Sequence, residues 1–274
     1  MAIITISRGT FSGGEKLAEC LNQRIGYRTI SREVILHAAS EYGVSEERLI
    51  KAIEQKPSIK ERLALDVDRF HYLSFIQAAL CEEAKNDNII YHGHAGHLLL
   101  KGVSHVIKVK VIADMEQRIV FAMDRNKLSR EDAIGYIKKV DEQREKWARF
   151  LYDVDWNDPY LYDIVINLKK MTIPTACEII SIMVKADEFK TTDSSRMAMG
   201  NLVLASRVKA VLASSDATKN FSLEVIADNG IVTVSGKVDT MEDVENISEL
   251  VKNIKDVKGV SCKCHPHYLK DAVL

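Results

Sequence analysis

The sequence predicts an α/β protein in which a parallel sheet carries helices on both faces, followed by a small α+β domain. Up to residue 189, short runs rich in β-branched residues alternate with longer stretches of helical periodicity. Parallel strands need helical crossovers, so this order of elements builds a parallel sheet. Beyond a polar stretch, the pattern changes to short elements around Asn229-Gly230, which is typical of a β-hairpin.

Each element before residue 190 is predicted from its apolar pattern and from the glycine or polar residues that end it. The first strand is stopped by Arg8-Gly9 and the Gly13-Gly14 pair, and the helix that follows is closed by Gly26. Strands are expected at residues 2–7, 27–31, 88–92, 106–112 and 163–167. Helices are expected at 15–25, 32–42, 46–55, 59–85, 115–127, 129–151 and 174–189.

The change of pattern also predicts two domains. At 274 residues the chain is longer than a usual single domain of roughly 100–200 residues. Residues 190–195 are polar and lack periodicity, so we expect one domain at 1–189, a linker at 190–200 and a second domain at 201–274. The second domain is predicted to have helices at 202–213 and 241–254 and strands at 222–227, 231–235 and 259–263.

Composition excludes several classes of protein. A chain with 46% hydrophobic and 28% charged residues is ordinary for a globular protein and unlike a disordered one. Its 38 basic and 39 acidic residues give a net charge of −1, hence no global field that would attract nucleic acid or an anionic membrane. Neither a membrane span nor a signal peptide is expected. The five cysteines, odd in number and mostly isolated, are typical of reduced thiols in a cytoplasmic protein.

The segment from Ser7 to Ala18 has the context of a phosphate-binding loop. A strand enters it and a helix leaves it; glycines between them let backbone N–H groups point inward, and the helix N-terminus adds partial positive charge. In the register Gly9-x4-Gly14, Glu15 stands where a nucleotide triphosphatase loop has lysine. From these residues alone, a glycine-rich turn without a ligand is an equal alternative.

Several segments share their order and spacing with one known family: 4–8, 12–14, 17–18, 26–35, 90–94, 141–149, 155–159 and 162–167. Together they resemble the cytidylate kinase-like family, a branch of the P-loop nucleoside monophosphate kinases, over about residues 1–185. The resemblance implies a P-loop kinase-like sheet, binding of ATP and Mg²⁺, and transfer of a phosphoryl group to a nucleoside monophosphate or similar small acceptor.

The resemblance also implies a set of site residues. Arg144 and Arg149 would close from a mobile lid over the phosphates as catalytic residues. Arg32 and His94 would contact the acceptor. The donor phosphates would be cradled by the loop and the start of its helix, which comprise Arg8, Gly9, Thr10, Phe11, Ser12, Gly13, Gly14, Glu15 and Lys16.

Three positions depart from the family. Glu15 replaces the usual arginine, and a carboxylate repels phosphates unless Mg²⁺ lies between them. Ser31 stands where the family usually has an acid, and His94 where it has an arginine that could fork onto phosphate. These departures favour an alternative function, a non-catalytic nucleotide-binding sensor that signals to a partner. The retained Arg144 and Arg149 favour catalysis.

Other motifs leave alternatives open. The basic residues between Arg125 and Arg149 fit either an arginine-bearing lid or a solvated amphipathic helix. Aromatic residues from 147 to 160 fit either base stacking or packing of that helix against the core. The histidines of 92–97 match no common zinc spacing, and Cys262-x-Cys264-His265-x-His267 would need all four ligands to converge from one extended segment, so no metal site is expected.

The C-terminal segments 204–212, 226–238 and 257–260 resemble a BON domain, over nearly all of residues 201–265. BON domains are linked to contacts with phospholipid or with partner proteins. No residue pattern in this part points to catalysis, so we expect a ligand-sensing or protein-interaction role for it.

Overall fold

The computed structural model describes residues 2–54 and 67–266, which divide into two compact units. The first unit comprises residues 2–34, 53–54 and 86–195, and the second comprises 35–52, 67–85 and 196–266. The C-terminal residues therefore share a unit with a helical segment from the first third of the chain. The sequence predicts instead that residues 1–189 form one domain, so this association of residues 35–52 and 67–85 with the C-terminal part is not foreseen.

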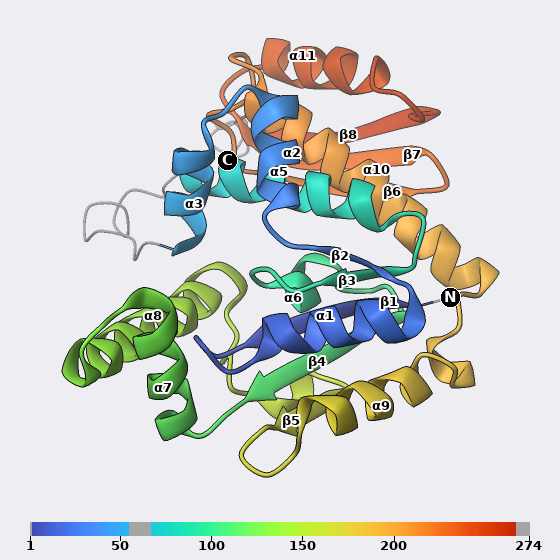
Figure 1. The fold of residues 1–274 in the computed structure, drawn as a ribbon. Helices are drawn as coiled ribbons and strands as arrows, with labels where there is room; N and C mark the ends of the chain where they lie inside the picture. Colours follow the sequence, from blue (N-terminus) through green and yellow to red (C-terminus); the bar gives the residue numbers. More distant parts are fainter. Residues whose placement is uncertain (1, 55–66, 267–274) are drawn as a thin grey trace. The chain divides into compact units, whose positions relative to one another are not determined.

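The first unit is built on a parallel five-stranded sheet with strand order β2-β3-β1-β4-β5 (Figure 1). On the central strand, Ile4 lies opposite Ile90 on one side and Ile107 on the other. The strands are β1 (Ile3–Arg8), β2 (Arg28–Ile30), β3 (Ile89–Tyr91), β4 (Val106–Ile112) and β5 (Ile164–Asn167). Their order and direction confirm the predicted α/β fold class.

Two groups of helices accompany this sheet, one packed in its core and one with an apolar cluster of its own. The core is formed by Ile4 and Ile6 of the sheet with Leu17, Leu21 and Ile180 of two helices that pack on each other, α1 and α9. A separate helical pair, α7 and α8, has its own small apolar cluster. The helices are α1 (Gly14–Ile25), α6 (Gly96–Leu99), α7 (Met115–Asn126), α8 (Arg130–Tyr152) and α9 (Ile173–Met183), with 3₁₀ turns at Pro159–Leu161 and Asp187–Phe189.

Helix α1 begins differently from its neighbours. Asp114, Ser129 and Thr172 cap α7, α8 and α9, each accepting a hydrogen bond from a backbone N–H of the first turn. The corresponding residue of α1 is Gly13, which has a φ of 91° and offers no side chain. The first-turn N–H groups of α1 therefore keep their capacity to bind an anion.

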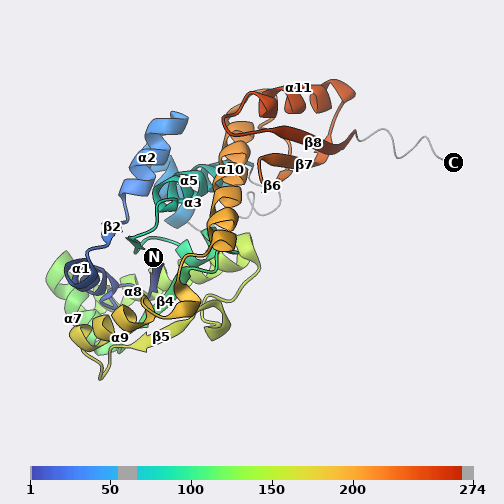
Figure 2. The same ribbon diagram turned by 90° about the vertical axis from the view of Figure 1, so that its right-hand side faces the viewer.

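The second unit has a three-stranded sheet of order β6-β7-β8, in which β6 and β7 are antiparallel and β7 and β8 parallel (Figure 2). Asn229 and Gly230, with φ of 51° and 91°, form the predicted hairpin turn. The elements are most of α2 (Glu33–Tyr42), α3 (Glu46–Glu54), α5 (Val67–Ala84), α10 (Asp193–Ser214), β6 (Leu223–Asp228), β7 (Ile231–Val238), α11 (Met241–Lys252) and β8 (Gly259–Pro266).

Side-chain contacts hold the helical segment within this second unit. Arg207 of α10 pairs with Glu82 of α5 at 3.2 Å and with Asp256 at 3.0 Å. Tyr42 of α2 stacks on Phe75 of α5 with ring centroids 4.6 Å apart. These contacts join α2 and α5 to α10.

Two of the predicted helix boundaries near the linker differ in the structure. Helix α10 begins at Asp193, inside the predicted linker, and α9 ends at Met183 rather than at residue 189. Residues 55–66, which include the last residue of the expected helix 46–55 and the start of the expected helix 59–85, lie outside the described residues. All five cysteines are free thiols. Among the described helices, none has the length and apolar character needed to cross a bilayer.

Candidate nucleotide site

The loop between β1 and α1 is a tight turn attached to the neighbouring strand. The Ser12 hydroxyl donates to the carbonyl oxygens of Gly9 at 2.8 Å and Val111 at 3.1 Å, and the Ser12 N–H donates to Gly9 at 3.1 Å. Phe11 and Gly13 both have positive φ, of 60° and 91°. These bonds and dihedral angles set the conformation of residues 9–13.

Charged side chains of α7 and α8 hold this loop at Thr10. The Thr10 N–H donates to Asp141 Oδ1 at 2.9 Å, and its carbonyl accepts from Arg118 Nε at 2.8 Å. Arg118 also pairs with Asp141. Arg144 donates to the Arg8 carbonyl and to the Thr10 hydroxyl, each at 3.1 Å. The structure therefore places Arg144 against the loop.

Arg8 brings a second guanidinium to the same place. A Cβ added at Gly14 would lie 2.4 Å from Arg8 Cδ, so the arginine stem runs directly over the start of α1. Its guanidinium donates to the carbonyl of His92. Burial, followed by the positive charge of Arg144, lowers the pKa of Arg8 to about 10. Arg8 stays charged at neutral pH, and two cations held this close favour an anion between them.

His94 lies beside these two arginines. Burial, reinforced by Arg144 and Arg8, lowers the pKa of His94 well below its ordinary value of 6.5, so its ring is neutral. The loop around it wraps the ring of Tyr91, whose hydroxyl donates to the His94 carbonyl at 3.1 Å. A Cβ at Gly93 would lie 2.2 Å from that ring, so only glycine fits there. His94 can exchange a hydrogen bond here but adds no charge.

Glu15 and Lys16 both face α7. The Glu15 carboxylate pairs with Arg125 in the last turn of that helix, and this hydrogen bond is the largest cause of its lowered pKa. The Lys16 ammonium lies 4.4 Å from the ring centroid of Phe121. The charge of Glu15 is thus partly neutralised by the Arg125 guanidinium.

The other two predicted residues are exposed, unlike the partly buried Arg8, His94 and Arg144. Arg32 is exposed in the turn between β2 and α2, and Arg149 is exposed on α8. The Ser31 N–H donates to the Glu33 carboxylate at 2.7 Å. The family usually has an acid at the position of Ser31. In this chain the carboxylate of Glu33, two positions further on, lies beside Ser31 instead.

Two cavities adjoin the loop and share Ser12. The first, of about 400 Å³, is charged, and its lining includes Arg8, Arg144 and Lys110 together with the carboxylates of Asp141 and Glu145. The second, of about 550 Å³, is mainly apolar and lies between α7 and the segment that follows β5. It is lined in part by Gly13, Val120, Phe121, Leu168 and Ile173. A polar and an apolar compartment therefore meet at the loop.

A buried polar cluster lies behind the charged cavity. Lys110, 5% exposed, donates to the carbonyl of Trp156 at 2.5 Å and to Asn157 at 3.1 Å, and burial lowers its pKa to about 8. His97 Nδ1 lies 2.8 Å from the Ser7 hydroxyl, and its ring packs on that of Trp156 with centroids 5.2 Å apart. Trp156 is therefore a core residue, 7% exposed, that also lines the charged cavity.

The His97 ring should make folding stability sensitive to acid. Burial, followed by Lys110 and Lys108, lowers its pKa to about 3. An unfolded chain binds a proton at histidine near pH 6.5, so between pH 6.5 and 3 the unfolded state holds more protons. From this residue alone, the free energy of unfolding should fall by about 1.4 kcal/mol per pH unit as the pH drops through that range.

Urea unfolding of wild type and His97→Gln between pH 7 and 4 measures this contribution. We expect the stability of the variant to depend less steeply on pH, by up to one proton. The exposed His265 of β8 supplies the control, and His265→Gln should follow the wild type. Parallel curves for wild type and His97→Gln would show that the pKa of His97 is the same in the folded and unfolded states, contrary to this expectation.

Sequence reasoning missed Arg118 and Lys110 as parts of this region, and it did not pair Arg125 with Glu15. Each reaches the loop or its surroundings only through tertiary contacts; the Arg118–Thr10 and Arg125–Glu15 pairs are separated by 108 and 110 residues. No local pattern reports such a contact. For metals, the described residues contain no group of three or more His, Cys, Asp or Glu side chains arranged to hold an ion, and His267 lies outside them.

Comparisons with known proteins agree with this architecture. Residues 3–170 match the model of the cytidylate kinase-like family, and residues 202–263 match that of the BON domain. A cytidylate kinase of Pyrococcus horikoshii is 27% identical, over 61% of this chain and 80% of its own. One of Methanothrix thermoacetophila is 29% identical, over 60% of this chain and 87% of its own.

A solved structure shares the fold. An uncharacterized protein from Eubacterium ventriosum has a TM-score of 0.50 and 20% identity, over 68% of this chain and 99% of its own. At this identity the likeness supports the fold alone. The model of the cytidylate kinase-like family matches more than half of this chain, so the chain belongs to that family, with a BON domain after the kinase-like part.

Proposed function

We propose that the first 170 residues transfer the γ-phosphoryl group of ATP to a nucleoside monophosphate or a similar small acceptor. The observation that carries this proposal is the meeting of Arg8 and Arg144 at the uncapped N-terminus of α1. Backbone N–H groups and two guanidinium groups there offer the charge-assisted hydrogen bonds that phosphates accept. The relatives named cytidylate kinase support this class of substrate.

Each part of the region has a role in this proposal. The loop from Arg8 to Gly14 holds the donor phosphates, with Lys16 beside it, and the apolar cavity takes the nucleoside half of ATP. His94 and Arg32 contact the acceptor. Arg144 and Arg149 neutralise the charge that develops on the transferred group. Little covalent chemistry is asked of the protein, because positioning and charge neutralisation carry the rate of phosphoryl transfer.

Mg²⁺ fits the donor set of the charged cavity. The carboxylates of Asp141 and Glu145 line it together with the Ser12 hydroxyl, and Mg²⁺ binds through one or two carboxylates plus substrate phosphates. Asp141 and Glu145 would hold the ion. When bound, it neutralises charge on the phosphate oxygens.

A panel of nucleoside monophosphates incubated with ATP and Mg²⁺, followed by coupled detection of ADP, tests the proposal. We expect at least one acceptor to raise ADP release well above the rate seen with ATP alone. ADP release that stays at that background with every acceptor would overturn the transferase function.

A second candidate function is a non-catalytic sensor, in which the kinase fold binds a nucleotide and the BON domain signals to a protein or phospholipid partner. Glu15 favours the sensor, because its carboxylate stands in the first turn of α1, where it repels the phosphates of a nucleotide. In the structure it pairs with Arg125. Tight ATP binding without ADP release from any acceptor would decide for the sensor.

Glu15→Arg should tighten ATP binding about tenfold to a hundredfold and reduce its dependence on Mg²⁺. The change removes a charge that repels phosphate and adds a charge-assisted hydrogen bond, worth roughly 1.5–3 kcal/mol. The lost pair with Arg125 is exposed, and such pairs contribute about 1 kcal/mol or less. Calorimetric titration of ATP, with Mg²⁺ and with a chelator, measures both effects.

Glu19→Arg is the matched control, because Glu19 is exposed one turn further along α1. Its affinity for ATP should stay close to that of the wild type. If Glu15→Arg and wild type bind ATP equally under both conditions, Glu15 does not tune the site.

A further inference from the structure

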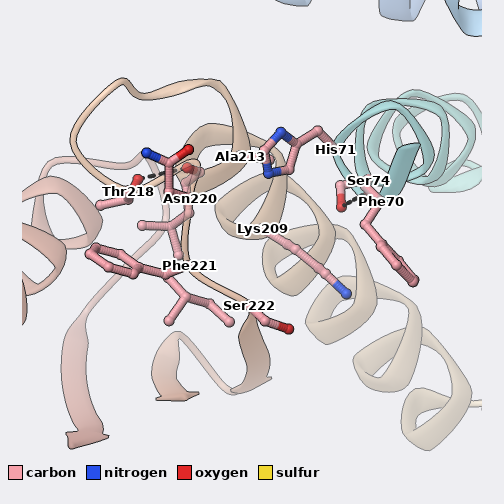
Figure 3. Close-up of a pocket in the computed structure, with 11 residues that line it drawn as sticks. Phe70, His71, Ser74, Lys209, Ala213, Thr218, Asn220, Phe221 and Ser222 are labelled. Carbon is pink, nitrogen blue, oxygen red and sulfur yellow. Dashed lines mark hydrogen bonds between the residues drawn. The ribbon is translucent and has the colours of Figure 1, made fainter. Parts of the chain in front are cut away.

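The second unit contains a cavity of about 200 Å³ that the kinase function does not use. Side chains from three segments line it: α5, the C-terminal half of α10, and the residues that lead into β6 (Figure 3). In the close-up, His71 of α5 and Lys209 of α10 come from the two helices, and Thr218 and Asn220 from the connecting segment.

The walls of this cavity are largely apolar. Leu212 and Leu223 are 2% and 9% exposed, and Phe70, Ala213 and Phe221 complete much of the lining. An apolar cavity of about 150 Å³ holds benzene. A space of about 200 Å³ therefore suits one aromatic ring with a short substituent.

Lys209 gives the cavity a positive charge. Lys209 is half-buried, and burial lowers its pKa, although the carboxylate of Glu224 partly opposes the shift. Within the described residues, no acidic side chain lines the cavity, and Lys209 forms no ion pair of 4.0 Å or less. A half-buried cation that forms no ion pair with a described residue favours an anionic ligand.

The remaining polar groups add hydrogen-bond donors. The hydroxyls of Ser74 and Thr218 donate to the carbonyls of Phe70 at 2.9 Å and Leu212 at 2.6 Å, so only their oxygen lone pairs face a ligand. By contrast, the side chains of Asn220 and Ser222 are exposed and form no hydrogen bond with another described residue. The Ser222 hydroxyl and the Lys209 ammonium can donate to a ligand.

We infer that this cavity binds a small aromatic anion, in which one ring carries a carboxylate or a phosphate. The ring would pack against the apolar walls, and the anionic group would accept hydrogen bonds from Lys209 and from the exposed hydroxyl of Ser222. Apolar surroundings with a few placed polar groups are the usual composition of a small-molecule site.

The residues that line the cavity come from both family matches. Phe70, His71 and Ser74 lie within the kinase-family match, and the α10 and β6 residues lie within the BON match. Both family segments therefore supply the cavity, and its ligand contacts α5 and α10 together. Binding should raise the melting temperature of the full chain, because a ligand that binds only the folded state stabilises it.

Ligand-observed NMR titration of the full chain with phenylacetate and phenyl phosphate tests the inference, and the two probes distinguish a carboxylate from a phosphate head. Phenylacetamide, the neutral analogue of phenylacetate, is the matched control ligand. We expect saturable binding of at least one anion, and binding of phenylacetamide at least tenfold weaker than that of phenylacetate if the carboxylate is recognised. Lys209→Met should weaken binding of the anion tenfold or more, and Lys252→Met, on an exposed position of α11, should not.

Ala213→Phe fills the cavity and should abolish binding, provided that the variant melts cooperatively. The comparison of ligands and the Lys209→Met variant do not depend on Ala213→Phe folding. Absence of saturable binding of both anions would overturn the inference. So would anion affinities unchanged in Lys209→Met, because they would locate the probe elsewhere on the protein.

Discussion

Gly13→Val is expected to abolish ATP binding, weakening it at least a hundredfold. Gly13 has a φ of 91°, a left-handed conformation that a β-branched residue rarely adopts. A Cβ there would lie 3.0 Å from Leu168 Cδ1, and a valine would add further atoms at the uncapped start of α1. The phosphates would lose their close approach to the backbone N–H groups.

Calorimetric titration of ATP measures the effect, and thermal melting shows whether the variant is folded. Gly135 of α8 provides the control, because a Cβ added there meets nothing within 4 Å. Gly135→Ala should bind ATP like the wild type and gain roughly 0.5–1 kcal/mol of stability from helix propensity. ATP bound equally well by folded Gly13→Val would show that the loop is not the nucleotide site.

Arg144→Ala should lower kcat/KM for phosphoryl transfer by about 10²–10³-fold. Its guanidinium donates to both the Arg8 carbonyl and the Thr10 hydroxyl, so it sets the loop and carries positive charge to the same cavity. Removing one donor aimed at developing charge costs about 10²–10³ in rate in other enzymes. Arg144→Lys should recover only part of the rate, because lysine lacks the planar fork.

Steady-state kinetics with the best acceptor tests this expectation. Lys139→Ala is the control, because Lys139 is an exposed basic residue on the same helix. We expect it to retain kinetics close to those of the wild type. If the rate of Arg144→Ala fell no further than that of Lys139→Ala, Arg144 would be a structural residue of the loop and not a catalytic one.

The sequence predicted the sheet well because its signals are local. Runs of β-branched residues marked the strands, and the glycines at 13 and 14 marked the loop before any contact was known. The start of α10 was misplaced for a local reason as well. The Ser195 N–H donates to the Thr192 hydroxyl at 3.1 Å, so the polar stretch that is typical of a linker also contains a helix cap.

The site was only partly predictable, because most of its contacts join distant residues. The resemblance indicated Arg144, but nothing local indicates that Asp141 binds the Thr10 N–H or that Arg125 pairs with Glu15. The grouping of residues 67–85 with the C-terminal unit depends in the same way on contacts such as Glu82–Arg207. Such pairs are decided by tertiary packing, which a single sequence does not display.

Identification of the products made from ATP, Mg²⁺ and a nucleoside monophosphate tests the central claim most directly. ³¹P NMR of the reaction should show the resonances of a new nucleoside diphosphate increasing together with those of ADP. The same mixture with Gly13→Val should show neither. If wild-type protein that binds ATP yields no nucleoside diphosphate from any acceptor, or releases ADP and inorganic phosphate alone, then the chain does not transfer the phosphoryl group to a nucleotide.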